Sequence, residues 1–214
     1  MKKFELTSET KINIFGKKLF RIKALISFGD VKAGETGGWV EKEENVNQSG
    51  NAWVYGDAMV SGNAMVSGNA MVYGDAMVSG NAWVYGDAWV SGNAMVSGNA
   101  MVSGNAKVYG DAWVFGNAWV SGNAKVYGDA MVSGDAKVSG DADYATIHGF
   151  GTQFRTTTFF RCKDKKVRVA CGCFFGTIPE FREQVKDTRK GKIAEEYLVI
   201  SDLMEKHFEV KSNE

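Results

Sequence analysis

The residues best suited to catalysis or metal binding are two histidines and three cysteines, all in the last third of the 214-residue chain. Cys171 and Cys173 form a C-x-C pair. With Cys162 or His148 as a further ligand this pair could bind zinc, but one C-x-C is weak evidence because buried strand cysteines are common. We interpret His148 and His207 as surface or packing residues, since no convergent polar groups can be identified around either. We therefore predict no catalytic residues, no metal site and no cofactor.

A second set of candidate residues recurs in the middle of the chain, where every tyrosine of the repeat is followed two positions later by an aspartate. Four of these pairs are spaced by three or six repeat units and should stack along one edge as a candidate binding edge: Tyr55, Asp57, Tyr73, Asp75, Tyr109, Asp111, Tyr127 and Asp129. Carboxylates stacked about 5 Å apart repel by roughly 1–3 kcal/mol, and Asn93 interrupts the row. Two interpretations stay open: corners stabilised by tyrosine stacking and turn amides, or an edge that binds a cation or a partner.

The repeat that positions these residues has a period of six, as in GNAWVYGDAMVSGNA at residues 50–64. Glycine recurs at every sixth position from 50 to 140. Within each hexad Ala and Val flank one large residue, which predicts a short strand with Ala and Val inward and the large side chain outward. Gly followed by Asn or Asp suits a tight corner. Because no unit leaves room for a hairpin, we predict a parallel solenoid over residues 50–145, in which three hexads form one 18-residue triangular coil.

The hexad VSGNAM resembles the repeat of left-handed parallel β-helices, in which an aliphatic residue is followed four places later by a small one. This resemblance implies a left-handed coil and frequent trimers, in a family that includes acyltransferases and γ-type carbonic anhydrases. A right-handed triangular helix, as in bacterial polymer-forming cytoskeletal proteins, is the alternative. Enzymes of the hexapeptide family use histidines as a base or as zinc ligands, whereas residues 50–145 contain no His, Cys, Glu or Arg. An acyltransferase-like enzyme is therefore an alternative and not our main prediction.

The two flanks are similar to bacteriophage and prophage hexapeptide-repeat proteins, on the motifs RIKALISFGDV, GGWVEKEENV and CGCFFGTIPEFREQV. We predict a β-rich cap at 1–49, with a hairpin around residues 16–18, and an α+β domain at 146–214. The latter should be a small ββαα unit with strands at 156–162 and 166–173 and helices at 177–188 and 193–208. Thr177 and Glu180 form a capping box for the first helix. The buried face of the second is predicted to contain Tyr197, Ile200, Leu203, Met204 and Phe208.

The outward strand positions hold Met seven times, Trp five times, Lys three times and Asp once. Taking every third hexad sorts them into three faces, of which those beginning at Trp53 and Met65 acquire lysines. The third face is uncharged and consists of Met59, Met77, Met95, Trp113 and Met131. A flat apolar patch of about 400 Å² is near the limit that monomers leave exposed. We therefore predict that this face is an oligomer interface, most simply in a homotrimer.

The charge and composition of the chain argue against nucleic-acid-binding, secreted and membrane-spanning proteins. Lys plus Arg and Asp plus Glu are balanced at 25 each, and no basic stripe indicates nucleic-acid binding. The first residues are too polar for a signal peptide, and no apolar run is long enough to span a membrane. The three cysteines indicate a reducing cytosol, which would be the host cytoplasm if a phage encodes the chain. We predict a non-catalytic, phage-type β-solenoid that self-assembles and binds a host or viral partner, for example as an inhibitor of a host system. A second alternative is an oligomer that sequesters a small molecule such as a nucleotide signal.

Overall fold

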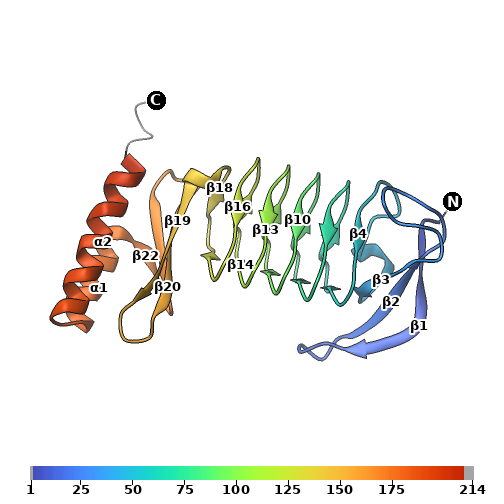
Figure 1. The fold of residues 1–214 in the computed structure, drawn as a ribbon, viewed down its shortest axis with the longest axis horizontal. Coiled ribbons are helices and arrows are strands. Elements are labelled where there is room, and N and C mark those ends of the chain that lie inside the picture. Colours follow the sequence, from blue (N-terminus) through green and yellow to red (C-terminus); the bar gives the residue numbers. More distant parts are fainter. Residues whose placement is uncertain (1, 210–214) are drawn as a thin grey trace.

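The structure is a computed structural model that describes residues 2–209. Figure 1 shows three parts in a row: a β-rich N-terminal end, a central solenoid, and a C-terminal sheet covered by two helices. The hexads form fifteen short strands. These strands are β4 (Trp53–Val54), β5 (Met59–Val60), β6 (Met65–Val66), β7 (Met71–Val72), β8 (Met77–Val78), β9 (Trp83–Val84), β10 (Trp89–Val90), β11 (Met95–Val96), β12 (Met101–Val102), β13 (Lys107–Val108), β14 (Trp113–Val114), β15 (Trp119–Val120), β16 (Lys125–Val126), β17 (Met131–Val132) and β18 (Lys137–Val138).

Strands that lie three hexads apart pair in parallel, as Met59 does with Met77 and Val60 with Val78. The solenoid thus has three walls, with strand orders β4-β7-β10-β13-β16, β6-β9-β12-β15-β18 and β5-β8-β11-β14-β17. The predicted parallel solenoid with 18-residue coils is confirmed. It follows from the six-residue period, because three sides of six return the chain to its starting position one strand further on.

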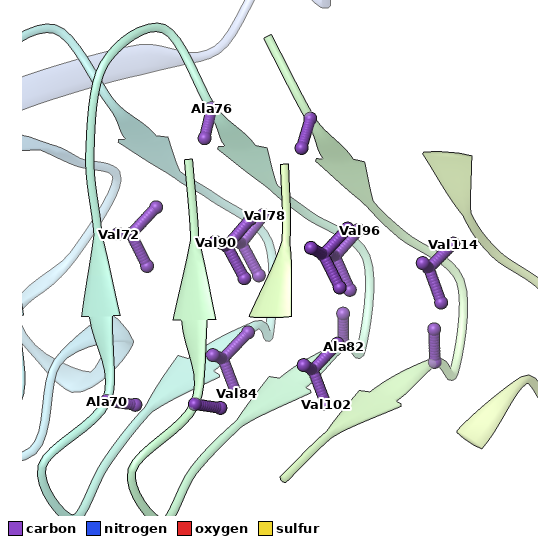
Figure 2. Close-up of a cluster of buried hydrophobic side chains, with 14 of the residues drawn as sticks. Ala70, Val72, Ala76, Val78, Ala82, Val84, Val90, Val96, Val102 and Val114 are labelled. Carbon is purple, nitrogen blue, oxygen red and sulfur yellow. The ribbon is translucent and has the colours of Figure 1, made fainter. Parts of the chain in front are cut away.

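The interior of the solenoid consists of the Ala and Val of every hexad, which are fully buried from Ala52 to Val138. Figure 2 shows these small side chains pointing from the three walls into the space between them. Their size sets the width of the coil, because only short side chains fill a prism this narrow without voids. The corners depend on glycine, whose φ angles lie between +59° and +73° from Gly50 to Gly134.

The N-terminal end is a hairpin that extends one wall of the solenoid. Strands β1 (Phe4–Ile12) and β2 (Lys18–Ala24) pair antiparallel, as expected, and β2 pairs with β3 (Thr36–Val40). A single 3-10 turn follows at η1 (Glu43–Asn45). Strand β3 pairs in parallel with β5, so the first coil begins before residue 50. The hexad pattern does not detect this coil because the chain from Trp39 to Met59 is longer than three hexads.

Trp53 occupies its predicted outward strand position, in register with Met71, but other residues cover its side chain completely. The rings of Phe4 and Phe28 pack edge-on against it, with centroids at 5.8 and 5.4 Å. The ammonium group of Lys3 donates to the carbonyl oxygen of Ala52 at 2.9 Å. The N-terminal segment therefore covers the first hexad and shields its open edge.

The C-terminal end is an antiparallel sheet of four strands in the order β19-β20-β21-β22, followed by two helices. A 3-10 turn at η2 (Asp141–Asp143) leads into the sheet. The strands are β19 (Tyr144–Phe150), β20 (Arg155–Arg161), β21 (Val167–Cys171) and β22 (Phe174–Thr177), and the helices are α1 (Ile178–Thr188) and α2 (Lys192–Glu209). The predicted two strands and two helices are present, and the ββαα description missed β19 and β22. The first was missed because it follows the last hexad without a break, and the second because only Gly172 and Cys173 separate it from β21.

Sheet and helices enclose a second core around Phe159, Val169 and Phe181. The predicted capping box of α1 is confirmed, with the Glu180 amide donating to Thr177 Oγ1 at 3.3 Å. Leu203 was wrongly placed on the buried face of α2 and is 57% exposed, because Ser201 occupies that face instead. No helix of the described residues is long and apolar enough to cross a membrane. The domain boundaries at residues 49 and 145 stay predictions.

Candidate interaction surfaces

The predicted interface residues lie in one row on the wall β5-β8-β11-β14-β17. This row, here called the Met face, consists of Met59, Met77, Met95, Trp113 and Met131. Trp113 is 46% exposed and the four methionines are partly exposed. Each side chain lies directly beside the next because the parallel strands are in register. The sequence therefore placed this row correctly, while its role as an interface stays a prediction.

Both ends of the Met face are bounded by other parts of the chain. At the N-terminal end Trp39 continues the row but is only 6% exposed. The Lys11 ammonium lies 4.6 Å from its ring centre and the Arg21 guanidinium 4.8 Å. At the C-terminal end the Met131 amide donates to Thr158 Oγ1 of β20 at 3.0 Å. The uncharged part of the wall is thus limited to the five residues of the Met face.

An apolar hollow of about 330 Å³, here called the C-terminal hollow, adjoins the Met131 end of the Met face. It is lined by Phe115, Gly116, Met131, Ser133, Gly134, Ala170, Gly172, Cys173, Phe174 and Phe175. The Phe175 ring lies over Gly134, and it would have to shift to admit a larger residue there, because a Cβ would be 2.6 Å from Cζ of the ring. Sequence reasoning missed this hollow, although Phe115 is the one corner of the repeat that has Phe instead of Ser or Tyr.

The other two walls carry cations above their aromatic rings. Lys107 Nζ lies 4.5 Å from the ring centre of Trp89, and Lys137 Nζ lies 5.9 Å from that of Trp119. In such cation–π contacts a charged ammonium group lies over the face of the ring, so the aromatic surface of these walls is partly covered by charged groups. The Met face differs from both walls in having no lysine.

The candidate binding edge, here called the Tyr-Gly-Asp edge, is the corner row that leads into the Met face. It contains Tyr55, Asp57, Tyr73, Asp75, Tyr109, Asp111, Tyr127 and Asp129. The rings of Tyr55 and Tyr73 stack with centroids 5.0 Å apart, and those of Tyr109 and Tyr127 stack at 5.4 Å. Burial raises the pKa of Tyr55 and that of Tyr73, so both rings are neutral phenols at physiological pH. Tyrosine stacking, one of the two interpretations left open, is present at these two pairs, and the binding of a cation or a partner stays a prediction.

The aspartates of this edge have different surroundings. Asp57 accepts a hydrogen bond from Trp39 Nε1 at 3.3 Å and forms an ion pair with Arg21 at 3.5 Å. Asp111 accepts a hydrogen bond from Asn93 Nδ2 at 2.9 Å.

Among residues 2–209 no group of three or more His, Cys, Asp or Glu side chains lies close enough to hold a metal ion. A groove of about 410 Å³ lies beside the edge, lined by Tyr109, Lys125, Tyr127, Asp141, Tyr144, Ala145 and Thr146.

The corner rows rich in asparagine form hydrogen-bonded ladders that sequence reasoning missed. Asn63, Asn81 and Asn99 each donate from Nδ2 to Oδ1 of the asparagine one coil ahead, at 3.0–3.1 Å. An ionised aspartate accepts such a bond but has no proton to pass on. On the described Tyr-Gly-Asp edge the bond from Asn93 to Asp111 is accordingly the one ladder bond. The signal was present in the sequence as the recurrence of Asn at every third hexad.

The histidines and cysteines are dispersed over the C-terminal sheet and helix. His148 Nδ1 lies 3.1 Å from Thr156 Oγ1, whose hydroxyl lies 3.5 Å from Asp129 Oδ2. The ring of His207 packs on that of Phe208 at 5.1 Å. Burial raises the pKa of the Cys162 thiol to about 11, which makes it unreactive.

The comparison with known proteins agrees with this geometry. A family model described as "YdcK Beta solenoid repeat" matches residues 52–68, 58–74, 70–86, 88–104 and 124–140. All of these segments lie within the 18-residue coils. The chain is a β-solenoid repeat protein. This solenoid protein is 37% identical over 65 residues to a protein of Escherichia coli (strain K12) named "Uncharacterized acetyltransferase YdcK". The similarity covers 26% of this chain and 19% of that relative, so the chain spans about a fifth of the relative's length.

Proposed function

We propose that this β-solenoid protein is non-catalytic, associates with its own copies through the Met face and presents the Tyr-Gly-Asp edge to a partner protein. The observation that carries the proposal is the Met face, an uncharged row of five large side chains in register. At about 25 cal/mol per Å², burying about 400 Å² contributes roughly 10 kcal/mol per chain before the cost of association. A threefold arrangement, as expected from the hexapeptide resemblance, is one way to bury it.

The Tyr-Gly-Asp edge supports the second half of the proposal. It combines stacked tyrosines with aspartates and lies beside the groove of about 410 Å³. Aromatic rings with hydroxyl groups are enriched in protein interfaces, and carboxylates select a basic partner. The similarity of the flanks to phage and prophage proteins is our reason for proposing a host protein as that partner.

A capture experiment tests the partner role. Immobilised wild type and a double variant, Asp111→Asn with Asp129→Asn, are exposed to bacterial lysate, and bound proteins are identified by mass spectrometry. We expect a basic protein that the wild type retains and the variant loses. The matched control is Asp87→Asn, because Asp87 also accepts a ladder bond from an asparagine but lies in another corner row. Identical protein sets from all three would contradict a role of this edge.

An acetyltransferase is the second candidate, because the relative in Escherichia coli carries that name. The contact of His148 with Thr156, near Asp129, is the one place in the described chain where a histidine meets a hydroxyl group. We expect the protein not to consume acetyl-coenzyme A with amine or hydroxyl acceptors. Turnover in the wild type that His148→Ala abolishes would favour the enzyme over the non-catalytic proposal.

A further inference from the structure

The turn between β1 and β2 ends in three exposed apolar side chains. Ile12, Ile14 and Phe15 are 64%, 74% and 55% exposed, and residues 12–15 are here called the hairpin tip. The tip is held in shape by Asn13, whose Oδ1 accepts from the amides of Phe15 at 3.0 Å and Lys17 at 2.9 Å. The hairpin tip is therefore a preorganised apolar projection, which loses little conformational entropy when it binds.

The hairpin that carries the tip and the C-terminal hollow belong to opposite ends of one eight-stranded sheet. The hairpin extends the eight-stranded sheet that also contains the Met face, and Phe115 and Met131 of the hollow lie at the far end of that sheet. In Figure 1 the lower side of the solenoid carries β14 of the Met face. The β1–β2 hairpin starts at the N-terminal end, and its turn reaches back below the solenoid. The β19–β20 turn extends below the solenoid at the C-terminal end.

This arrangement suits a second copy of the same chain turned end for end. When two Met faces meet antiparallel, each hairpin tip comes to the end of the other copy where the C-terminal hollow lies. Both contacts form at once and the pair is closed, because a twofold axis makes them equivalent. Parallel copies would instead bring tips beside tips and leave the hollows empty.

The area of the contact favours the same occupant. A Met face of about 400 Å² supplies half of the roughly 800 Å² per partner that a standard stable interface buries. A tip and a hollow on each copy add apolar surface to the same contact.

We propose that the hairpin tip of one copy occupies the C-terminal hollow of a second copy, which lies antiparallel across the Met face. The inference rests on the proposed self-association and specifies its geometry. It predicts a twofold pair, in contrast to the threefold packing considered above.

Disulfide trapping tests the contact with a cysteine that the hollow already contains. Cys173 is an exposed free thiol that lines the hollow, and Ile14→Cys places a second thiol on the tip. Mild oxidation of Ile14→Cys should give a covalent dimer in high yield. The dimer should disappear when Ile14→Cys is combined with Cys173→Ser. Leu203→Cys is the matched control, because Leu203 is similarly exposed but lies on α2, and it should give no dimer above the background.

The outcomes separate this inference from the proposal on which it rests. A cross-link that persists without Cys173 would show tips meeting tips and would overturn the antiparallel geometry. If the protein assembles but forms no cross-link, the contact between tip and hollow is overturned while self-association stands. The same holds if the assembly has three times the mass of one chain. A monomeric wild type would remove both proposals together.

Discussion

The Lys3 ammonium lies 2.9 Å from the carbonyl oxygen of Ala52, at the open edge of the first hexad. Lys3 is 2% exposed, and burial lowers its pKa from 10.5 to about 8. Between these two pH values the folded chain binds fewer protons than the unfolded chain, so stability must rise with pH in this window.

We therefore predict that the wild-type melting temperature increases from pH 8 to pH 10, relative to a Lys3→Met variant. The corresponding gain in unfolding free energy is at most about 3 kcal/mol, since one pKa unit is equivalent to about 1.4 kcal/mol. Circular dichroism melts of both proteins at matched ionic strength measure it. Parallel pH profiles for the two proteins would contradict the assignment.

Two glycine corners provide a matched test of coil stacking. A Cβ on Gly80 would lie 3.0 Å from the nitrogen and oxygen of Gly98, whereas one on Gly128 meets no described atom within 4 Å. Both have a positive φ, which costs an alanine roughly 1–2 kcal/mol. We expect Gly80→Ala to lower the midpoint of chemical denaturation clearly more than Gly128→Ala. Equal effects would mean that coil spacing adjusts freely.

We predict that the aspartates of the Tyr-Gly-Asp edge make the fold less stable than asparagines would at the same positions. In Asp75→Asn the new amide could donate to Asn93, and the repulsion between Asp57 and Asp75 would be lost. We expect a gain in unfolding free energy of about 0.5–1 kcal/mol, the value of a modest hydrogen bond. Asn99→Asp, which removes the donor to Asn117 at 3.0 Å, should cost a similar amount. If Asp75→Asn instead destabilises the protein, the carboxylate has a structural role that this account lacks.

Much of the architecture could be predicted because the information is local and repeated. In every hexad Ala and Val point inward because side chains alternate along the short strand. A correct assignment of one hexad therefore predicts the orientation of all the others, including the outward row of the Met face. The burial of Trp53 could not be predicted, since it depends on Phe4 and Phe28, which are brought there by the fold of the N-terminal segment. The C-terminal hollow could not be predicted for the same reason, because Phe115 and Phe175, which both line it, are far apart in the sequence.

The central claim is that copies of this protein meet through the Met face, and light scattering tests it most directly. The samples are wild type, the double variant Met77→Glu with Met95→Glu, and a control double variant on another wall, Met65→Glu with Met101→Glu. Carboxylates are costly to bury without partners, so the first double variant should dissociate to the 23.3 kDa of one chain. Wild type and control should both retain a mass of at least two chains. A wild-type mass of one chain, or an unchanged assembly in the Met77 and Met95 double variant, would contradict the account.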